Sequence, residues 1–223
     1  MPNWTYCMLE APKAVIEKYL SKDEDGDLYF DFNKVIPRPD IYQDPDMSEG
    51  GDTTLCLYWY LSARGKISPR EIFIRFGNIF NNDGWYFNDP VMIERMLRDC
   101  NNHSGEYYRR GEKYFTAYKS YGYRSWYTWS IDNWGTKWNA CETRVSYDDN
   151  GFGVVHFDTA WSYPEPIIDK IFKDNPNCVI NFSWYDEDYD GHHCIGRNEH
   201  GVWTRWEDWD PEVFSEREKE DEN

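Results

Sequence analysis

Acidic and imidazole side chains crowd one short segment near the C-terminal end, and these residue types bind metal ions. The segment DEDYDGHHC, residues 186–194, begins with the D-x-D-x-D-G pattern of a calcium-binding EF-hand loop. The twelfth loop position is Arg197, where calcium requires a glutamate, and strand-like residues precede the loop where an EF-hand has a helix. The candidate ligands are Asp186, Asp188, Asp190 and His192, with His193, Cys194, His200 and His156 as further ligands for zinc. Adjacent histidines on a strand point to opposite faces, so we favour a solvated acidic turn and expect no metal or other cofactor.

Cations alternate with aromatic rings in a second segment, residues 106–129. Its candidate binding residues are Tyr107, Tyr108, Arg109, Arg110, Lys113, Tyr118, Lys119 and Arg124. Proteins bind single-stranded nucleic acid with this combination, because cations contact the backbone and rings stack on bases. The same residue types dominate hot spots of protein interfaces. They also suit a structural segment whose rings are buried and whose cations offset an acidic surrounding, and all three interpretations stay open.

Two tryptophans, two asparagines and a lysine surround Gly135 in the segment NWGTKWNA, residues 133–140. We expect a strand that bends sharply at this glycine, with a tryptophan packed on either side and Trp161 as a packing partner. The amides would then bond neighbouring backbone, as irregular buried turns require. Alternatively, the polar groups bind the phosphate or carboxylate of a ligand. The candidate binding residues are Asn133, Trp134, Lys137, Trp138, Asn139, Asp158 and Trp161.

Signatures of nucleophilic catalysis are missing from the sequence. It contains no G-x-S-x-G motif and no glycine-rich phosphate loop. Acidic pairs are abundant, as they are by chance in any acidic protein. Asp31, Asp132 and Asp158 lie beside the motifs described here and are the carboxylates in which a raised pKa would indicate function. No catalytic residue is assigned, and we lean against an enzyme.

The composition indicates a folded protein of one large domain or a domain with an insertion. Of the 223 residues, 40% are hydrophobic and 19% aromatic, which is enough for a packed core. No apolar run approaches the roughly 20 residues that span a bilayer. The first residues lack the pattern of a secretory signal, so we expect a cytoplasmic protein without a membrane partner. The six cysteines have no C-x-x-C spacing, which favours reduced thiols over disulfides or metal ligands.

The formal net charge of −17 makes a basic protein surface the expected partner. Phosphate backbones are repelled by such a charge, so nucleic acid is a less favoured partner. Residues 207–223 hold nine acidic and two basic side chains and are expected to form a disordered, solubilising tail.

The periodicity predicts an α+β protein with a helical insertion. Strands are expected at 3–11, 28–37, 125–134, 141–149, 152–161, 177–188 and 195–206, with a type I′ turn at Asn150–Gly151. Helices are expected at 12–20, 53–65, 68–80, 88–100 and 162–176. In the fourth helix, Val91, Met92, Met96 and Leu97 are expected on one buried stripe. Residues 1–43 with 123–206 would form one domain, with two helices on one face of an antiparallel sheet, and residues 44–122 would form the insertion.

Four short motifs resemble a known family. They are MPNW at 1–4, FDFNKVIPRP at 30–39, WSIDNWGTKWNA at 129–140 and FDTAWSYPEPII at 157–168. Together they resemble the YubB-type ferredoxin-like domain family of phages, plasmids and the bacteria that carry them. The resemblance implies a ferredoxin-like fold without an iron–sulfur cluster, and it implies no established activity or catalytic residues.

The expected function is therefore that of a non-enzymatic, acidic interaction protein of a mobile genetic element. Such a protein could inhibit a host nucleic-acid-binding defence complex, because carboxylates on a rigid sheet imitate phosphates electrostatically. The alternatives are a small-molecule- or metal-dependent enzyme built around the 133–140 segment, and a single-stranded nucleic-acid binder that uses residues 106–129. The sequence does not indicate the oligomeric state.

Overall fold

Two compact units make up the chain. The computed structural model describes residues 3–44, 47, 52–62, 66–80, 89–99, 104–187, 194–199 and 202–206, with only the backbone of the last two ranges. One unit, here called the sheet unit, contains Met1–Pro37 and Ser130–Asn223, and the other, the helical unit, contains Arg38–Trp129. The expected boundaries lay at 43/44 and 122/123. The acidic tail lies outside the described residues.

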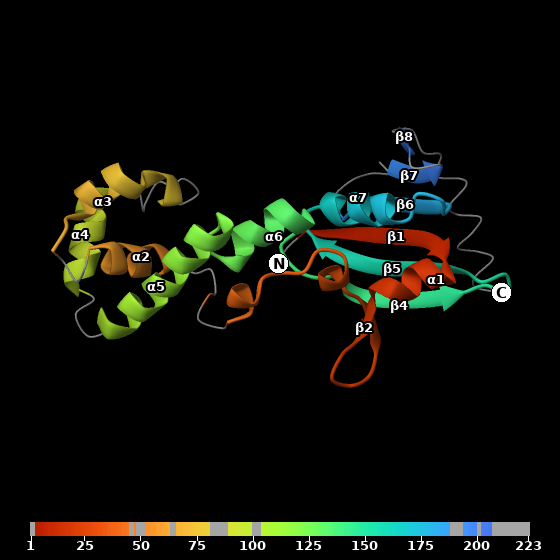
Figure 1. Ribbon diagram of the computed structural model, residues 1–223, viewed down its shortest axis with the longest axis horizontal. Coiled ribbons are helices and arrows are strands. Elements are labelled where there is room, and N and C mark those ends of the chain that lie inside the picture. Colours follow the sequence, from red (N-terminus) through yellow and green to blue (C-terminus); the bar gives the residue numbers. More distant parts are fainter. Residues whose placement is uncertain are drawn as a thin grey trace. The chain divides into compact units, whose positions relative to one another are not determined.

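The sheet unit is built on a six-stranded antiparallel sheet (Figure 1). In spatial order its strands are β4 (Cys141–Tyr147), β5 (Phe152–Ala160), β1 (Trp4–Pro12), β6 (Ile180–Asp186), β7 (Cys194–Glu199) and β8 (Val202–Trp206). The first strand of the chain is thus inserted between two strands that come more than a hundred residues later. Strands β7 and β8 pair as an antiparallel hairpin where one strand, 195–206, was expected.

Two helical segments cover one face of this sheet. They are α1 (Lys13–Ile16), continued by the 3-10 helix η1 (Glu17–Tyr19), and α7 (Glu165–Asp174). Residues of β1 alternate between half-buried and buried, as a strand requires when one face packs on a core. The four apolar residues of α7 that were predicted to face inward, at 167, 168, 171 and 172, are all buried. The element order β-α-β-β-α-β, with sheet order β4-β5-β1-β6, confirms the predicted ferredoxin-like α+β fold.

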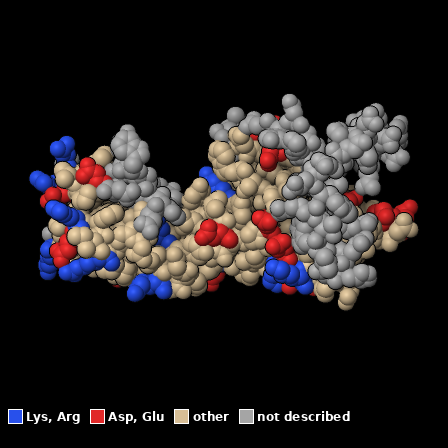
Figure 2. Space-filling model, turned by 90° about the horizontal axis from the view of Figure 1, so that it is seen from above, with Lys and Arg blue, Asp and Glu red and all other residues tan. Residues whose placement is uncertain are grey.

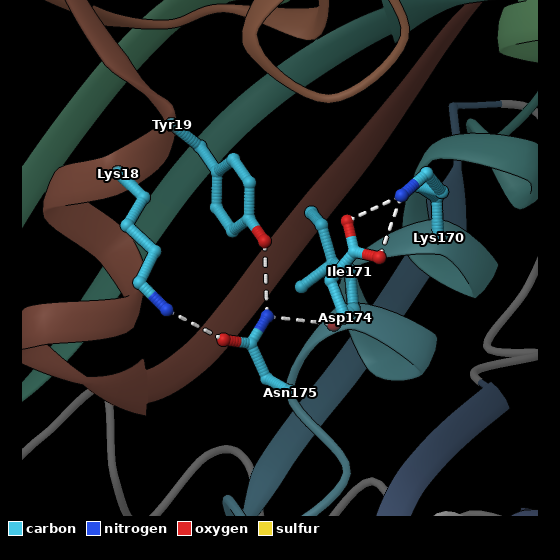
Figure 3. A network of polar contacts seen from close by, with 6 residues as sticks. All are labelled: Lys18, Tyr19, Lys170, Ile171, Asp174 and Asn175. Atoms are coloured by element: carbon cyan, nitrogen blue, oxygen red, sulfur yellow. Dashed lines mark hydrogen bonds and ion pairs between the residues drawn. The ribbon is translucent and has the colours of Figure 1, made fainter.

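A buried amide links the two helical segments on this face (Figure 3). Asn175, at the C-terminal end of α7, donates from Nδ2 to the Tyr19 hydroxyl at 2.9 Å and to the Ile171 carbonyl at 2.8 Å. Its Oδ1 accepts from Lys18 Nζ at 2.9 Å. All three hydrogen-bonding groups of the amide are therefore used, which makes its burial stable.

Three local predictions were wrong. Residues 28–37 do not form a strand of the main sheet: β2 (Leu20–Lys22) and β3 (Leu28–Phe30) pair in a separate two-stranded sheet, followed by the 3-10 helix η2 (Phe32–Lys34). Phe30 instead packs its ring on that of Phe157, 4.8 Å away between centroids. The turn at 150–151 joins β4 and β5 as expected, but only Gly151 has positive φ, so the turn is not type I′.

The third error concerns residues 126–134, which form the helix α6 (Trp126–Trp134) instead of a strand. Aromatic residues favour strands when they alternate across a sheet, which is why the segment looked extended. In α6, however, the buried residues are Trp129, Ser130 and Trp134, at the spacing of one helical face. The boundary between the two units falls within this helix.

The helical unit contains α2 (Thr53–Leu61), α3 (Pro69–Phe76), α4 (Pro90–Asp99), α5 (Ser104–Tyr121) and the first residues of α6, with short 3-10 helices η3 (Asp40–Gln43) and η5 (Gly77–Phe80). Ser68 caps α3 as predicted, with its hydroxyl accepting from the Glu71 amide at 3.3 Å. The predicted stripe of α4 was partly wrong, because Val91 is 65% exposed whereas Ile93 is buried. Among the described residues, no helix combines the length and the apolar character that crossing a bilayer requires.

The formal charge is divided unequally between the units. The helical unit, residues 38–129, holds 12 Lys and Arg against 12 Asp and Glu, so its charges cancel. The sheet unit holds the other 12 basic and 29 acidic residues and therefore the whole net charge of −17. On the face seen in Figure 2, Lys and Arg gather at the left end, over the helical unit.

Helices α2 and α5 approach each other closely at a glycine. Seven consecutive residues of α2, from Thr53 to Trp59, are buried, so this helix is surrounded on all sides. A Cβ atom on Gly111 of α5 would lie 2.0 Å from the Cys56 carbonyl oxygen and 2.7 Å from Tyr60 Cβ. Only a residue without a side chain permits this approach.

Gly111→Ala is expected to lower the free energy of unfolding by about 2–4 kcal/mol, because the new methyl group overlaps backbone that cannot rotate away. Gly105→Ala, in the same helix, is the matched control: nothing lies within 4 Å of its Cβ position. That control should be neutral or should stabilise by up to about 1 kcal/mol through helix propensity. Urea unfolding followed by the helical circular dichroism signal measures both, and equal effects would contradict the proposed close contact.

Candidate functional site

Three tryptophans belong to the segments that come together where β1 and β4 begin and β5 ends. We call this place the tryptophan corner and define it as Trp4, Gly135–Asn139 and Thr159–Ser162. Trp4 lies opposite Ala160 in the strand register, and its ring centroid is 6.2 Å from that of Trp138. The Trp161 amide donates to the Asn3 carbonyl at 2.9 Å. The start of β1 therefore contacts both the ring of Trp138 and the backbone of Trp161.

Gly135 ends a helix and does not bend a strand. Helix α6 stops at Trp134, and Gly135 follows with φ +78°, the left-handed conformation that commonly closes helices. Its amide donates to the Ile131 carbonyl at 3.0 Å. A Cβ atom on Gly135 would lie 2.8 Å from Pro166 Cδ, so the turn packs directly on the start of α7. The chain therefore turns sharply at Gly135 as predicted, but a helix precedes the turn where a strand was expected.

Hydroxyl groups fix the backbone on both sides of Trp161. Thr136 Oγ1 donates to the Ala160 carbonyl at 2.8 Å. Ser162 Oγ donates to the Gly135 carbonyl at 2.5 Å, and Thr159 Oγ1 donates to the Ser162 carbonyl at 2.8 Å. These bonds tie residues 159–162 to the segment after α6 and to each other, so the corner is rigid.

Asn139 serves the structure of the corner. Its Oδ1 accepts from the Phe32 amide at 2.8 Å and from the Ala140 amide at 3.0 Å. Its Nδ2 donates to Asp31 Oδ1 at 2.9 Å. Burial alone would raise the pKa of Asp31, but hydrogen bonds from Asn139, Ser21 and Asn33 outweigh it and lower that pKa. Asp31 therefore shows the opposite of the raised pKa that would indicate function.

The remaining tryptophans of the motif lie in different environments. Trp134 is fully buried and donates from its indole nitrogen to the Ile36 carbonyl at 2.9 Å. Trp161, expected to pack inside the corner, is instead 56% exposed and has φ +75°. Lys137 Nζ lies 4.3 Å from the ring centroid of Trp138, a cation–π contact. Asn133, near the end of α6, is half-buried.

A second irregularity lies beside the corner, where β4 pairs with β5. The register shifts between Cys141 and Arg144, and Glu142 in this bulge has φ +47°. Asp158 lies opposite Cys141. Burial raises the pKa of Asp158, the Glu142 carboxylate raises it further, and Arg144 opposes both. Burial, with Asp158 and Glu142, also raises the pKa of the Cys141 thiol, which favours the protonated form over a nucleophilic thiolate.

Most cations of the segment 106–129 have partners within the helical unit. Arg110 forms an ion pair with Asp52 and donates to the Tyr114 hydroxyl, and Lys113 Nζ lies 2.5 Å from the Asp44 carboxylate. Arg124 is buried. Tyr108 lies beside Tyr60, Tyr118 accepts a hydrogen bond from Asn78, and Lys119 lies over the ring of Phe115. Tyr107 is half-buried and Arg109 is exposed. All five residues belong to α5. These contacts match the structural interpretation of the segment.

The predicted metal ligands cannot be assembled from the described residues. Asp186 ends β6, where its carboxylate accepts from the Thr5 hydroxyl at 2.5 Å. Asp188, Asp190, His192, His193 and His200 lie outside the described residues. Within the part of the chain that the structure describes, no three His, Cys, Asp or Glu side chains are grouped to hold an ion. The described cysteines at positions 7, 56, 141 and 178 are free thiols.

The sequence analysis missed Trp4, which belongs to the corner, and Glu142, which lies beside it. Trp4 was placed in a strand but not in the site, although the alternation of β1 puts Trp4, Tyr6 and Met8 on one face. Tyr6 stacks on Tyr185 of β6, with centroids 4.7 Å apart. Glu142 carried no sequence signal, because its position next to Asp158 depends on the bulge.

Gly135→Ala is expected to destabilise the sheet unit more than Gly151→Ala does. Both glycines have nearly the same φ, +78° and +77°, but nothing lies within 4 Å of a Cβ on Gly151. Gly151→Ala should therefore lower the free energy of unfolding by about 1–2 kcal/mol, through backbone strain alone. Gly135→Ala should lower it by at least about 1 kcal/mol more, because Pro166 must move. Urea unfolding compares the two, and equal losses would show that the contact with α7 is unimportant.

Neutralising Asp31 and Asp158 is expected to have opposite effects on stability at neutral pH. Asp31 has a lowered folded-state pKa, so its contribution is present above the unfolded pKa and is lost as pH falls through the folded pKa. Asp31→Asn should lower the free energy of unfolding by about 1–3 kcal/mol, because the new NH2 group would face hydrogen-bond donors from which the carboxylate now accepts.

Asp158 has a raised folded-state pKa, so its ionisation destabilises the fold as pH rises through the unfolded and then the folded pKa. Asp158→Asn should therefore raise the free energy of unfolding at pH values above that window and lose this advantage in acid. Chemical unfolding at neutral and acidic pH measures both variants. Changes of the same sign at neutral pH would refute the assignment.

A match to a protein-family model supports the ferredoxin-like fold. Residues 133–223, which include β4 to β8 and α7, match the family model described as "Ferredoxin-like domain in Api92-like protein". The crystal structure of protein api92 from Yersinia pseudotuberculosis is similar at 8% sequence identity and a TM-score of 0.44, over 94% of this chain and 99% of that one. No curated protein matches. The C-terminal part of the chain is thus similar to a ferredoxin-like family, whereas the YubB relationship and the link to phages and plasmids stay predictions.

Proposed function

We propose that this protein is a non-enzymatic interaction protein whose acidic sheet unit binds a basic protein surface. The observation that carries the proposal is the division of charge, −17 on the sheet unit and zero on the helical unit. A charge needed only for solubility would not have to be confined to one unit. Residues 207–223 contribute −7 of it, so the rest of the sheet unit still holds −10. Residues 1–37 and 130–206 of the sheet unit therefore carry more of the charge than residues 207–223 do.

Two acidic loops of the sheet unit hold their carboxylates in defined positions. In the loop between β2 and β3, Asp23 Oδ1 accepts from the amides of Asp25 and Asp27 at 3.0 and 2.9 Å. In the turn between β4 and β5, Asp148 Oδ1 accepts from the amides of Asn150 and Phe152 at 3.0 and 2.7 Å. Each loop thereby presents further exposed carboxylates on an ordered backbone. Fixed anionic groups are the feature that a surface needs to imitate nucleic-acid phosphates.

The resemblance to a family of phages and plasmids indicates what kind of partner the proposal concerns. A basic surface that normally binds nucleic acid, such as that of a host defence complex, would be occupied by the sheet unit of a mobile-element protein. Association would be fast and steered by charge, and it would weaken as salt screens the carboxylates. Nucleic acid and the sheet unit would then exclude each other from the same surface.

Basic nucleic-acid-binding proteins are expected to be retained from a bacterial lysate by the immobilised protein and displaced by duplex DNA. Their affinity should fall by roughly tenfold or more between low and physiological salt. Retention that is indifferent to salt, or that duplex DNA does not reduce, would contradict the proposal.

A pair of charge-matched variants tests whether the sheet unit makes the contact. Glu24→Gln, Asp25→Asn, Asp27→Asn and Asp149→Asn together remove four charges from the sheet unit. Glu71→Gln, Glu94→Gln, Glu106→Gln and Glu112→Gln remove four from the helical unit. Because the net charge changes equally, only the first variant should weaken binding several-fold at physiological salt. An equal loss in both would show that net charge alone attracts the partner.

A further inference from the structure

We propose that Trp161 is the anchor on which the sheet unit receives an arginine side chain of its basic partner. The inference rests on the proposed function, and it specifies the contact and the chemistry that is recognised there. It would make the tryptophan corner the specific part of an interface whose long-range attraction comes from the carboxylates.

The backbone of Trp161 is strained without a benefit to the core. A residue with φ +75° is in the left-handed region, which bulky side chains avoid and glycine enters freely. Among the described residues of the sheet unit, Gly26, Gly135 and Gly151 also have positive φ, and Glu142 is the other non-glycine residue that does. At position 161 the sheet unit has tryptophan, the largest side chain, and leaves it 56% exposed. A strained residue whose side chain faces solvent points to a role outside folding.

The corner fixes the backbone that carries the indole. The Trp161 amide is bonded to the Asn3 carbonyl, and the carbonyls of Ala160 and Ser162 accept from Thr136 and Thr159. An aromatic side chain on a fixed backbone loses little conformational entropy on binding. Among the described residues, no ring is stacked on that of Trp161, whereas Trp4 and Trp138 lie against each other.

Carboxylates lie on or next to the strands that form the corner. Lys137 already lies over the ring of Trp138, so the corner itself shows the geometry in which a cation contacts a tryptophan. Glu187, which is exposed, accepts from the Trp4 amide at 2.9 Å, and Asp158 lies two residues before Ala160. Arginine suits this place better than lysine, because its planar guanidinium stacks on a ring and bonds a carboxylate at its edge. Tryptophan and arginine are also the residue types most enriched in interface hot spots.

Two charge-matched peptides, nona-arginine and nona-lysine, test the inference by fluorescence anisotropy with the full-length protein. The wild-type protein should bind nona-arginine roughly fivefold to thirtyfold more tightly than nona-lysine. Trp161→Leu should abolish this preference while both peptides remain bound through charge. Trp161→Phe, which keeps an aromatic face, should retain most of it. Leu28→Ala, at a residue of the same unit that is 44% exposed, is the control and should change nothing.

Each outcome decides between the claims. If neither peptide binds the wild-type protein, the proposed function is wrong and the inference falls with it. If both bind and Trp161→Leu keeps the preference for arginine, the anchor is wrong while the function stands. If the protein binds oligothymidylate and not the peptides, and Trp161→Leu loses this binding, the assignment of a cationic partner is wrong. Trp161→Gly, which suits the positive φ, should fold at least as readily as the leucine variant and must give the same loss of preference.

Discussion

The sheet unit depends on a contact that joins its two chain segments, which residues 38–129 separate in the sequence. Strand β1 pairs with β5 and β6, so the two parts of the sheet unit must return to each other after residues 38–129. Trp134 makes this closure: its ring lies 5.7 Å from that of Phe32, and its indole donates to the Ile36 carbonyl. Closing a loop costs conformational entropy that grows only slowly with loop length. One buried ring with a satisfied nitrogen can therefore hold the ends of a long insertion, and Gly135 can direct the chain from that ring into the sheet.

The same closure fixes the backbone of the corner. The segment after Trp134 runs along the end of β5, where threonine and serine hydroxyls bond it to residues 160 and 162. Asn139 then joins it to the backbone of Phe32 and to Asp31. Ligand binding was the alternative interpretation of the polar side chains in this segment, and Asn139 instead bonds backbone amides, as the structural interpretation expects. Side chains that are not used in this way, above all Trp161, are the ones left to contact a partner.

Predictions from the sequence succeeded where one periodicity was strong and failed where composition and geometry conflicted. The apolar spacing of α7 and the alternation of β1 each match a single buried face, so both were correctly assigned. Residues 126–134 are rich in aromatics and were assigned to a strand, although Gly135 just after them is also the usual signal of a helix end. The exposure of Trp161 could not be predicted, because it depends on a backbone angle that the sequence does not encode locally. Asp31 and Asp158 illustrate the same limit: they are the same residue type, and only their neighbours set opposite pKa shifts.

Two features near the corner reduce stability, and the proposed recognition of a cationic partner would account for both. Ionised Asp158 is held in a half-buried place beside Glu142, and Trp161 is held at a positive φ with its ring in solvent. A cation bound at the corner would neutralise the carboxylates of Asp158 and Glu142 and would contact the exposed ring of Trp161. Charge repulsion between these carboxylates would then be lower in the complex, which increases the free energy gained on binding. Sequence positions that break local rules without serving the core are, by this argument, where the partner of an acidic ferredoxin-like protein should be sought.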